Sequence, residues 1–289
     1  MKHDQIIIGI NAFHADSSAC LIVNGKLIAA IEEERINRKK HYAGYPTEAI
    51  NECLKIGQID ISQVTDVAFN TKPYGNIIHK GIYLLKNLSL KKNAQINRLK
   101  QKKNLGKIFL QKFKLKKKIN FHYIEHHLAH LASAFYPSKF DIANGLSIDG
   151  SGDFVSIAIA ECKNKKIKLT EKVYFPNSLG IFYHAMTQFL DFRNYGDEYK
   201  IMGLAAYGQP IYFKKIFENL FVQDNKAEIK LNLNYFNHQK TNFNYIADEN
   251  LLIDQIFNDK LIQLFHNEKK DDNFRENFAS SVQKVYEFF

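Results

Sequence analysis

Two short stretches organise this chain: EHHLAH at residues 125–130 and IDGSGD at residues 148–153. The first stretch opens a predicted helix that continues to Ala134. Residues four apart on a helix project from the same face. His126 and His130 have that spacing, so the pattern predicts that two neutral imidazoles can hold one metal ion.

Asp149 can add a carboxylate to this pair. It follows the apolar run 145–148, which predicts a strand that leads into a Gly-rich turn. Two histidines and one carboxylate with open positions suit a catalytic divalent metal, Fe(II) or Zn(II). The N–H groups of the turn, those of Gly150 and Gly152 included, can face a phosphate.

The alternative interpretation is that the histidine pair binds nothing, because pairs at this spacing also arise by chance on helices. Three histidines in five residues, followed by the Asp-Gly turn, favour a site. His127 is the weaker ligand candidate. It can lie beside the core-facing side of the helix, or it can pair with His130 instead.

Composition and targeting signals limit which class of protein this sequence can encode. The chain has 289 residues, of which 45% are hydrophobic, enough for a large core in two lobes. Its three cysteines are far apart without a CxxC pair, which is typical of buried thiols in a reducing cytoplasm. The sequence has no signal-peptide pattern and no apolar run near the roughly 18 residues that cross a membrane. We therefore expect a cytoplasmic protein without a membrane span.

The formal charge of +10 is unevenly placed. No acidic residue occurs from Val67 to Ile124, whereas Lys and Arg are dense from Lys80 to Lys118. Such a block usually indicates nucleic acid or a membrane surface. No aromatic stacking platform is interleaved, because Phe109 and Phe113 have the spacing of a helix's apolar stripe. We do not expect a nucleic-acid partner. Attraction of an anionic substrate and a solvated helical insertion stay open as alternatives.

A unit of strand, loop, strand, turn and strand occurs twice. Asn24-Gly25 gives the first copy a strong two-residue hairpin signal. In each copy a loop rich in Asp and Ser follows the first strand. This duplication predicts two α/β lobes that face each other across a nucleotide cleft. The predicted strands are 5–10, 19–23 and 27–32, then 146–149, 155–162 and 167–174.

The loop after the first strand and the charged run after the third contain candidate anion contacts. Asp16 and Ser17 can offer N–H and hydroxyl groups to an anion, although a plain polar connection is equally consistent. The run 32–41 reads EEERINRKKH. It is either a surface mixture of ion pairs worth little, or it lines a cleft where Lys40 meets phosphate or carboxylate groups.

Lys200 is the one base in an otherwise small and apolar predicted helix at residues 197–208. Its ammonium group can reach a phosphate, or it can extend along the helix into solvent.

Five motifs in this order resemble the O-carbamoyltransferases of nodulation and antibiotic biosynthesis, the NodU/CmcH family. Several independent motifs in the right order are more specific than any one of them. The similarity covers nearly the whole chain, except for the basic insertion at about 76–118 and an Asn-rich stretch near 223–250. The motifs are FHADSS at 13–18, EEERINRKKH at 32–41, HHLAH at 126–130, IDG at 148–150 and KIMGLAAYG at 200–208.

The resemblance implies the two-lobed α/β fold of the actin/Hsp70/sugar-kinase type, which is ribonuclease H-like, with the second lobe incomplete. We expect the first lobe at residues 1–140, with the basic helical insertion, and the second lobe at residues 141–289. By this resemblance the chain is truncated before the adenosine-binding segment and before the C-terminal domain that forms the carbamoyl-adenylate. We therefore expect a truncated or split form, whose activity alone is doubtful and whose missing part can lie on a separate chain.

The resemblance also implies the chemistry. ATP and carbamoyl phosphate would give carbamoyl-AMP, and a hydroxyl of a sugar or an antibiotic-like metabolite would attack its carbonyl. His14 would be the general base for that hydroxyl, and Lys40 and Lys200 would contact carbamoyl or phosphate oxygens. The implied ligands of a divalent iron, with zinc as the alternative, are His126, His130 and Asp149. The other implied contacts of the nucleotide or carbamoyl phosphate are Asp16, Ser17, Gly150 and Gly152.

Two alternatives stay open. The fold type is shared with the enzymes of tRNA threonylcarbamoyl transfer, and the basic insertion favours a tRNA-modifying relative, whereas the run 32–41 favours the carbamoyltransferase. The other alternative is an inactive metal- or nucleotide-binding fragment that pairs with a second polypeptide.

Overall fold

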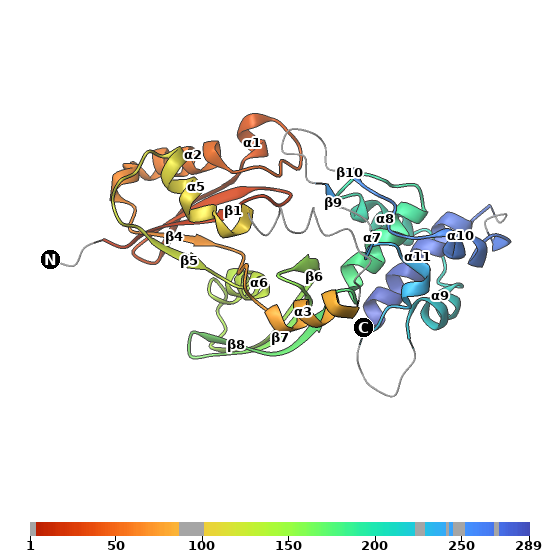
Figure 1. Ribbon diagram of the computed structural model, residues 1–289. Coiled ribbons are helices and arrows are strands. Elements are labelled where there is room, and N and C mark those ends of the chain that lie inside the picture. Colours follow the sequence, from red (N-terminus) through yellow and green to blue (C-terminus); the bar gives the residue numbers. More distant parts are fainter. Residues whose placement is uncertain (1–3, 87–100, 223–228, 241–242, 245–251, 269–271) are drawn as a thin grey trace. The chain divides into compact units, whose positions relative to one another are not determined.

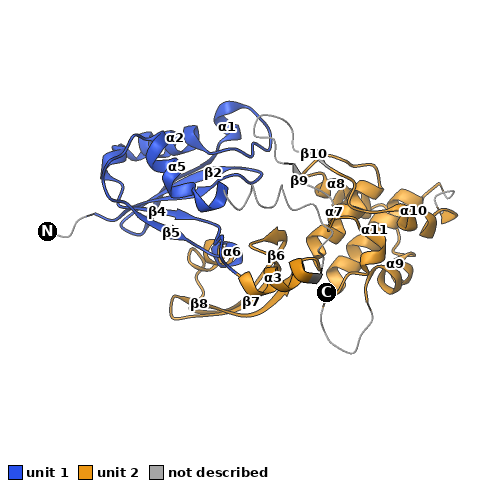
Figure 2. Cartoon of the chain, viewed as in Figure 1, with its two compact units in different colours: residues 1–75, 91–129, 244–252 blue, residues 76–90, 130–243, 253–289 orange. Residues whose placement is uncertain are grey.

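The chain forms two compact units in the computed structural model (Figures 1 and 2). The structure describes residues 4–86, 101–222, 229–240, 243–244, 252–268 and 272–289. Unit 1 comprises residues 1–75, 91–129 and 244–252. Unit 2 comprises residues 76–90, 130–243 and 253–289.

Unit 1 is built on a mixed five-stranded sheet with the strand order β3-β2-β1-β4-β5. β1 pairs antiparallel with β2, and β2 with β3, whereas β4 is parallel to both β1 and β5. A sheet with parallel neighbours and helices along the chain confirms an α/β class. The strands are β1 (Ile6–Asn11), β2 (Ser18–Val23), β3 (Lys26–Glu32), β4 (Asp66–Phe69) and β5 (Asn120–Tyr123).

The hairpin between β2 and β3 forms where the sequence predicts it. Asn24 and Gly25 both have positive φ, 50° and 81°, as a tight two-residue hairpin turn requires. In β1 the alternating Ile6, Ile8 and Ile10 are buried, so one face of the strand enters the core.

Helices cover the core of unit 1. They are α1 (Glu34–Asn37), α2 (Thr47–Gly57) and α5 (Leu105–Lys112), with a 3₁₀ turn at Ile61–Gln63. Gly57 is the last helical residue of α2, and Gln58 takes the left-handed conformation at the C-cap. A Cβ at Gly57 would lie 2.4 Å from Leu21 Cδ2, so this glycine permits close helix–sheet packing. The largest buried side chains of this core are Ile8, Leu21, Ile50, Phe69, Leu105 and Phe109.

The sheet of unit 2 is the second copy of the strand motif. It has three antiparallel strands in the order β6-β7-β8. The strand expected at residues 146–149 is longer than predicted and includes the Gly-rich segment that follows it. The bounds are β6 (Ile142–Gly152), β7 (Val155–Lys163) and β8 (Lys166–Tyr174).

The larger core of unit 2 is helical and rich in phenylalanine. Phe182, Phe265 and Phe278 are fully buried in it, together with Met186 and Ile201. A smaller cluster packs α6 against the strands of the sheet. The helices are α3 (Ile77–Lys86), α6 (His126–Phe135), which begins in unit 1, α7 (Leu179–Phe189), α8 (Glu198–Ala205), α9 (Phe213–Leu220), α10 (Asp259–Leu264) and α11 (Phe274–Phe288). Short elements complete the chain: a 3₁₀ turn at Leu233–Tyr235 and the pair β9 (Phe243–Asn244) and β10 (Leu252–Ile253).

The basic insertion expected at about 76–118 is helical in α3 and α5, whereas its last residues, 113–118, are not helical. Residues 87–100 of it lie outside the described residues. The boundary between two lobes at residue 140, and the cleft expected between them, stay predictions.

Candidate metal centre

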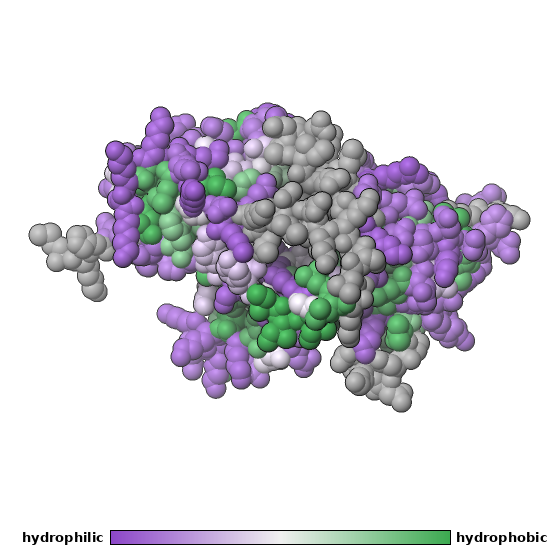
Figure 3. All heavy atoms as spheres, in the orientation of Figure 1, coloured by the Kyte–Doolittle hydropathy of each residue, from purple (hydrophilic) through white to green (hydrophobic). Residues whose placement is uncertain are grey.

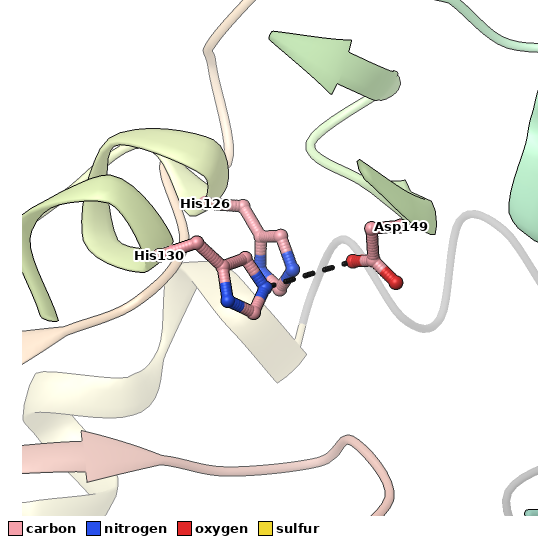
Figure 4. A group of neighbouring side chains, drawn as sticks. All are labelled: His126, His130 and Asp149. Carbon is pink, nitrogen blue, oxygen red and sulfur yellow. Dashed lines mark ion pairs between the residues drawn. The ribbon is translucent and has the colours of Figure 1, made fainter. Parts of the chain in front are cut away.

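Helix α6 presents His126 and His130 on one face. Leu131 and Phe135 of the same helix are buried in the core, which fixes the orientation of the helix. The histidines and Asp149 form a group in which one ligand atom of each residue lies within 4.8 Å of the others. Figure 4 shows both imidazoles on the side of α6 that faces the carboxylate. The structure therefore brings together the three residues that the sequence singled out as metal ligands.

A backbone carbonyl orients the first imidazole. His126 Nδ1 lies 3.2 Å from the carbonyl oxygen of Asn70, the residue after β4. A carbonyl can only accept, so Nδ1 carries the proton and Nε2 carries the lone pair. A metal-binding histidine typically donates its other N–H in this way.

Asp149 lies in an irregular part of β6. The register of the β6–β7 ladder shifts between Ile148 and Gly152, so Asp149 lies outside the regular pairing. Its Oδ1 accepts a hydrogen bond of 2.6 Å from the N–H of Gly150. Its Oδ2 lies 3.8 Å from His130 Nε2 (Figure 4).

The start of α7 supports this bulge. Ser178 is the N-cap of α7, and its Oγ accepts from the N–H of Ile181 at 3.0 Å. The same hydroxyl lies 3.0 Å from the carbonyl oxygen of Asp149 and 2.8 Å from that of Gly150. A Cβ at Gly180 would lie 2.7 Å from the carbonyl carbon of Asp149, so only glycine fits this approach.

The donor set fits a divalent metal. Ligand atoms around one such ion, each about 2.1 Å from it, lie roughly 3–4 Å apart. The distance of 3.8 Å between His130 Nε2 and Asp149 Oδ2 falls in this range and is too long for a direct hydrogen bond. Two imidazole nitrogens and one carboxylate suit Fe(II) and Zn(II) equally well.

His14 lies beside His126. Its ring centroid is 6.0 Å from that of His126. His14 Nδ1 lies 3.2 Å from the carbonyl oxygen of Ala15, which places the lone pair on Nε2. Ser17 is fully buried and anchors this loop, because its Oγ lies 2.7 Å from the carbonyl oxygen of Gly44 and 3.0 Å from that of His14. The Ser17 hydroxyl thus has a structural role in this loop.

Asp16 belongs to a second group. Its Oδ1 lies 2.9 Å from His41 Nδ1, and Glu34 Oε2 accepts from the backbone N–H of His41 at 2.7 Å. Ligand atoms of these three residues also lie within 4.8 Å of one another. Lys40, next to His41 in the chain, is exposed. These contacts within the group account for its geometry.

Neither interpretation of the run 32–41 predicted the role of Glu33. Its carboxylate is buried and accepts from the N–H of Glu48 at 3.2 Å and from the N–H of Ala49 at 2.7 Å. These N–H groups are in the first turn of α2, where a negative charge is favourable. The second acid of the run therefore caps a helix.

The other predicted phosphate contacts have local partners in this structure. Lys200 forms an ion pair of 2.7 Å with Asp197, and this hydrogen bond raises the pKa of Lys200 above its ordinary value. Gly152 pairs with Val155 in the ladder, and the N–H of Gly150 donates to Asp149. Roles for these residues, and for Lys40, in nucleotide binding stay predictions.

Sequence reasoning missed the residues that position the candidate ligands. A serine before an apolar run is an N-cap signal, so Ser178 could have been found as the start of α7. Its contact with Asp149 and the fit of Gly180 depend on the tertiary fold. The sequence gives no sign of the role of Asn70. Its backbone carbonyl oxygen contacts His126, and every residue has such a carbonyl. His127 is fully buried and is not a member of the ligand group.

A chain of mixed α/β fold that gathers two histidines and a carboxylate at one point has the features of a candidate metal-binding enzyme domain. Residues 6–288 match the family model described as carbamoyltransferase N-terminus. The chain therefore belongs to the family that this model describes, carbamoyltransferase N-terminus.

Relatives support this membership. The uncharacterized protein sll1178 of Synechocystis is 34% identical over 242 residues, which cover 80% of this chain and 39% of that protein. Nodulation protein NolNO of Sinorhizobium fredii is 33% identical over 223 residues, which cover 76% of this chain and 32% of that protein. The chain thus spans well under half the length of these relatives.

Among solved structures, a match is found to YeaZ from Pseudomonas aeruginosa. The match has 11% sequence identity and a TM-score of 0.33, and it covers 60% of this chain and 68% of that one. Within the described residues, no helix has both the length and the apolar character that a bilayer crossing needs.

Proposed function

We propose that this chain is the metal-binding N-terminal part of an ATP-dependent O-carbamoyltransferase. The group would move from carbamoyl phosphate, through carbamoyl-AMP, to a hydroxyl of a sugar or a secondary metabolite. The family supports carbamoyl transfer in general. The observation that carries the finer proposal is the convergence of His126, His130 and Asp149.

These three residues would hold the metal, for which we propose Fe(II), with Zn(II) as the alternative. A bound divalent ion supplies positive charge that stabilises anionic phosphate and carbonyl oxygens. The protein's own contribution is to orient the ligand side chains before the metal binds. Asn70 fixes the tautomer of the first imidazole, and Ser178 and Gly180 hold the bulge that carries the carboxylate.

His14 would accept the proton of the attacking hydroxyl at Nε2. Its Nδ1 contact with Ala15 leaves Nε2 as the basic atom, and an imidazole titrates near neutral pH. Its ring is 6.0 Å from that of His126, so a base stands beside the first proposed metal ligand. As the hydroxyl oxygen bonds to the carbamoyl carbon, the bond from that carbon to the AMP oxygen breaks and AMP leaves.

The remaining predicted contacts complete the proposal. Lys40 and Lys200 would meet carbamoyl or phosphate oxygens, and the N–H groups of the Gly-rich segment would assist them. Because Lys200 is held protonated by Asp197, it would approach an anion as a fixed positive charge.

We place the reaction in the cytoplasm, in keeping with the free thiols of Cys20, Cys53 and Cys162.

The test supplies this chain with the rest of its protein, as one full-length product or as a second polypeptide. Labelled carbamoyl phosphate, ATP and a panel of sugar acceptors are the substrates. We expect label on an acceptor hydroxyl, with a loss of about 100-fold or more in His14→Ala. His266→Ala, an exposed histidine outside the ligand group, is the matched control and should transfer as the wild type does. No transfer from carbamoyl phosphate to any acceptor, or full turnover by His14→Ala, would contradict the proposal.

A further inference from the structure

Helix α3 packs on the rest of unit 2 through one face and leaves the other face exposed. Ile78 and Leu85 are each 72% exposed, and Figure 3 shows apolar, green atoms where α3 lies in Figure 1. On the packed face, the ring of His79 stacks on that of Tyr174 with a centroid distance of 3.8 Å and an interplanar angle of 11°. Aromatic contacts of this kind therefore set the orientation of the helix.

The turn between β6 and β7 has an unfavourable backbone conformation. Its two central residues, Asp153 and Phe154, have φ angles of 50° and 76°, and a two-residue turn of type I′ requires positive φ at both positions. Asn24 and Asn164 come first in two other hairpin turns of the described chain, and asparagine adopts positive φ readily. A phenylalanine does not, because its Cβ crowds the following carbonyl oxygen. Among the described residues other than glycine, Phe154 has the largest positive φ.

Side chains from α3 and from the residue before it hold this turn. Asn76 Nδ2 donates to the carbonyl oxygen of Asp153 at 3.0 Å. Tyr83 meets the ring of Phe154 edge-on, with a centroid distance of 5.5 Å. Lys80 is half-buried, and the charge of the Asp153 carboxylate opposes the lowering of its pKa by burial. Three side chains of one segment thus act on the two residues with positive φ.

This turn also closes the segment that carries the candidate metal ligand Asp149. The ladder between β6 and β7 is regular up to the pair Ile148–Ile157. It resumes only with the pair Gly152–Val155, which the turn joins directly. Asp149 lies in the irregular stretch between these two pairs. If the turn opened, this stretch would lose one of its two anchors in the sheet.

We propose that α3 positions the carboxylate of Asp149 by holding the turn at Asp153 and Phe154 in its unfavourable conformation. The inference rests on the proposed function, because it takes Asp149 as a metal ligand. The hydrogen bond from Asn76 and the ring contact of Tyr83 offset the cost of the left-handed backbone at Phe154. Asn76 and Tyr83 are positioning residues, since neither belongs to the ligand group.

The alternative is that α3 only adds stability to unit 2. The two roles differ in what a glycine at position 154 would do. Glycine adopts positive φ without a steric cost, and Asp-Gly is a favoured sequence for a type I′ turn. With Phe154→Gly the turn would keep its conformation without help from α3. Loss of the Asn76 hydrogen bond should therefore affect the metal ligand only while Phe154 is present.

The experiment compares Asn76→Ala with its parent protein in two backgrounds, the wild type and Phe154→Gly. The affinity of the full chain for Zn(II) is measured by competition with a chelating indicator. In the wild-type background we expect Asn76→Ala to bind Zn(II) about tenfold more weakly, the usual loss when a group that orients a ligand is removed. In the Phe154→Gly background the same substitution should change the affinity by no more than about twofold.

A second measurement does not depend on a metal. The N–H of Gly150 donates to Asp149 Oδ1, so its hydrogen exchange in metal-free protein reports whether the ligand segment is ordered. Mass spectrometry of a peptide that covers residues 149–152 follows this exchange. We expect exchange about fivefold faster in Asn76→Ala, the effect of one lost hydrogen bond, and wild-type exchange when Phe154→Gly is also present.

Tyr136→Phe is the matched control. The hydroxyl of Tyr136 donates to the carbonyl oxygen of Lys165 at 3.2 Å, in the two-residue turn at the other end of β7. This variant also removes a side-chain hydrogen bond to a turn with positive φ, but its Zn(II) affinity and its exchange at residues 149–152 should match the wild type. Circular dichroism tests whether each variant is folded. Tyr83→Leu replaces Asn76→Ala if that variant unfolds, and the same effects are expected of it.

Several results would overturn the inference. One is unchanged exchange at residues 149–152, or unchanged Zn(II) affinity, in Asn76→Ala. Another is an effect of Asn76→Ala that persists in full with Phe154→Gly. An equal loss in Tyr136→Phe would assign the effect to general stability of the sheet. A wild type that binds no Zn(II) but shows the expected exchange pattern would contradict the proposed function, while it would support the positioning of Asp149 by α3.

Discussion

His126 Nδ1 lies 3.2 Å from the carbonyl oxygen of Asn70, and this contact decides which nitrogen of the imidazole offers its lone pair. The carbonyl fixes the proton on Nδ1, so Nε2 is the atom suited to a metal. Because the contact comes from the backbone after β4, the tautomer of the first ligand depends on the sheet of unit 1. The positioning of the carboxylate depends instead on the start of α7.

Ser178→Ala removes both the N-cap of α7 and the hydroxyl behind Asp149. We expect a loss of about 1 kcal/mol in the free energy of unfolding, the usual cost of a lost cap, and a weaker metal affinity. Asn258→Ala removes the N-cap of α10 and is the control. It should cost similar stability without a change in metal affinity. Equal metal affinity in Ser178→Ala and the wild type would show that the hydroxyl does not position the carboxylate.

Gly180→Ala places a methyl group against the backbone of Asp149, where an ideal Cβ would be only 2.7 Å from the carbonyl carbon. We expect a loss of about 1–3 kcal/mol in stability, because the bulge has to move, together with loss of metal. Gly203→Ala in α8 is the counterpart, since its Cβ would meet nothing within 4 Å. That change should stabilise the protein by about 0.5–1 kcal/mol. Urea titration of both variants measures the difference, and a neutral Gly180→Ala would contradict the packing argument.

Glu33→Ala removes the buried carboxylate that accepts from the first turn of α2. We expect a loss of about 1–2 kcal/mol in the free energy of unfolding, because the N–H groups of Glu48 and Ala49 lose their acceptor. Glu32→Ala, one residue earlier and more exposed, should change stability by less than about 0.5 kcal/mol. If both variants unfold at the same urea concentration, the carboxylate of Glu33 does not cap the helix.

His238 makes stability depend on pH. Burial lowers its pKa to about 4 from the ordinary 6.5, because the charged form loses solvation that the hydrogen bond to the Pro176 carbonyl does not replace. The unfolded chain therefore binds the proton more tightly than the folded protein does. The stability that neutral His238 provides is fully present above pH 6.5. It is lost as the pH falls toward 4, and the loss in unfolding free energy is about 2 kcal/mol at pH 5.

His238→Gln keeps a side-chain N–H for the Pro176 carbonyl and removes the titration. We expect the difference in unfolding free energy between pH 7 and pH 5 to be about 2 kcal/mol smaller in this variant than in the wild type. Urea denaturation at the two pH values checks this. An unchanged difference would mean that His238 titrates normally in the folded protein.

Local patterns predicted the parts of this structure that depend on neighbouring residues. Asn24-Gly25 formed its hairpin, and the spacing of His126 and His130 placed both on one face of α6. A glycine near the end of a helix resembles a cap, but Gly57 is helical and allows a close approach to Leu21 from another element. The contacts of Ser178 and Gly180 with Asp149 are likewise long-range, and no pattern in one sequence encodes them.

The orientation of α3 was also beyond local reasoning. Its sequence alone would place Ile78 and Ile82 toward a core, because aliphatic residues at helical spacing are usually buried. The aromatic groups around His79 and Tyr83, from strands far along the chain, determine the opposite rotation.

The central claim is that His126, His130 and Asp149 bind one divalent metal. The most direct measurement is the metal content of purified protein after reconstitution with Fe(II) or Zn(II) under anaerobic conditions, by elemental analysis. We expect about one ion per chain in the wild type and in the control His266→Ala, and near-complete loss in the double variant His126→Ala, His130→Ala and in Asp149→Asn. Equal metal content in all four proteins, with the variants still folded, would contradict the account.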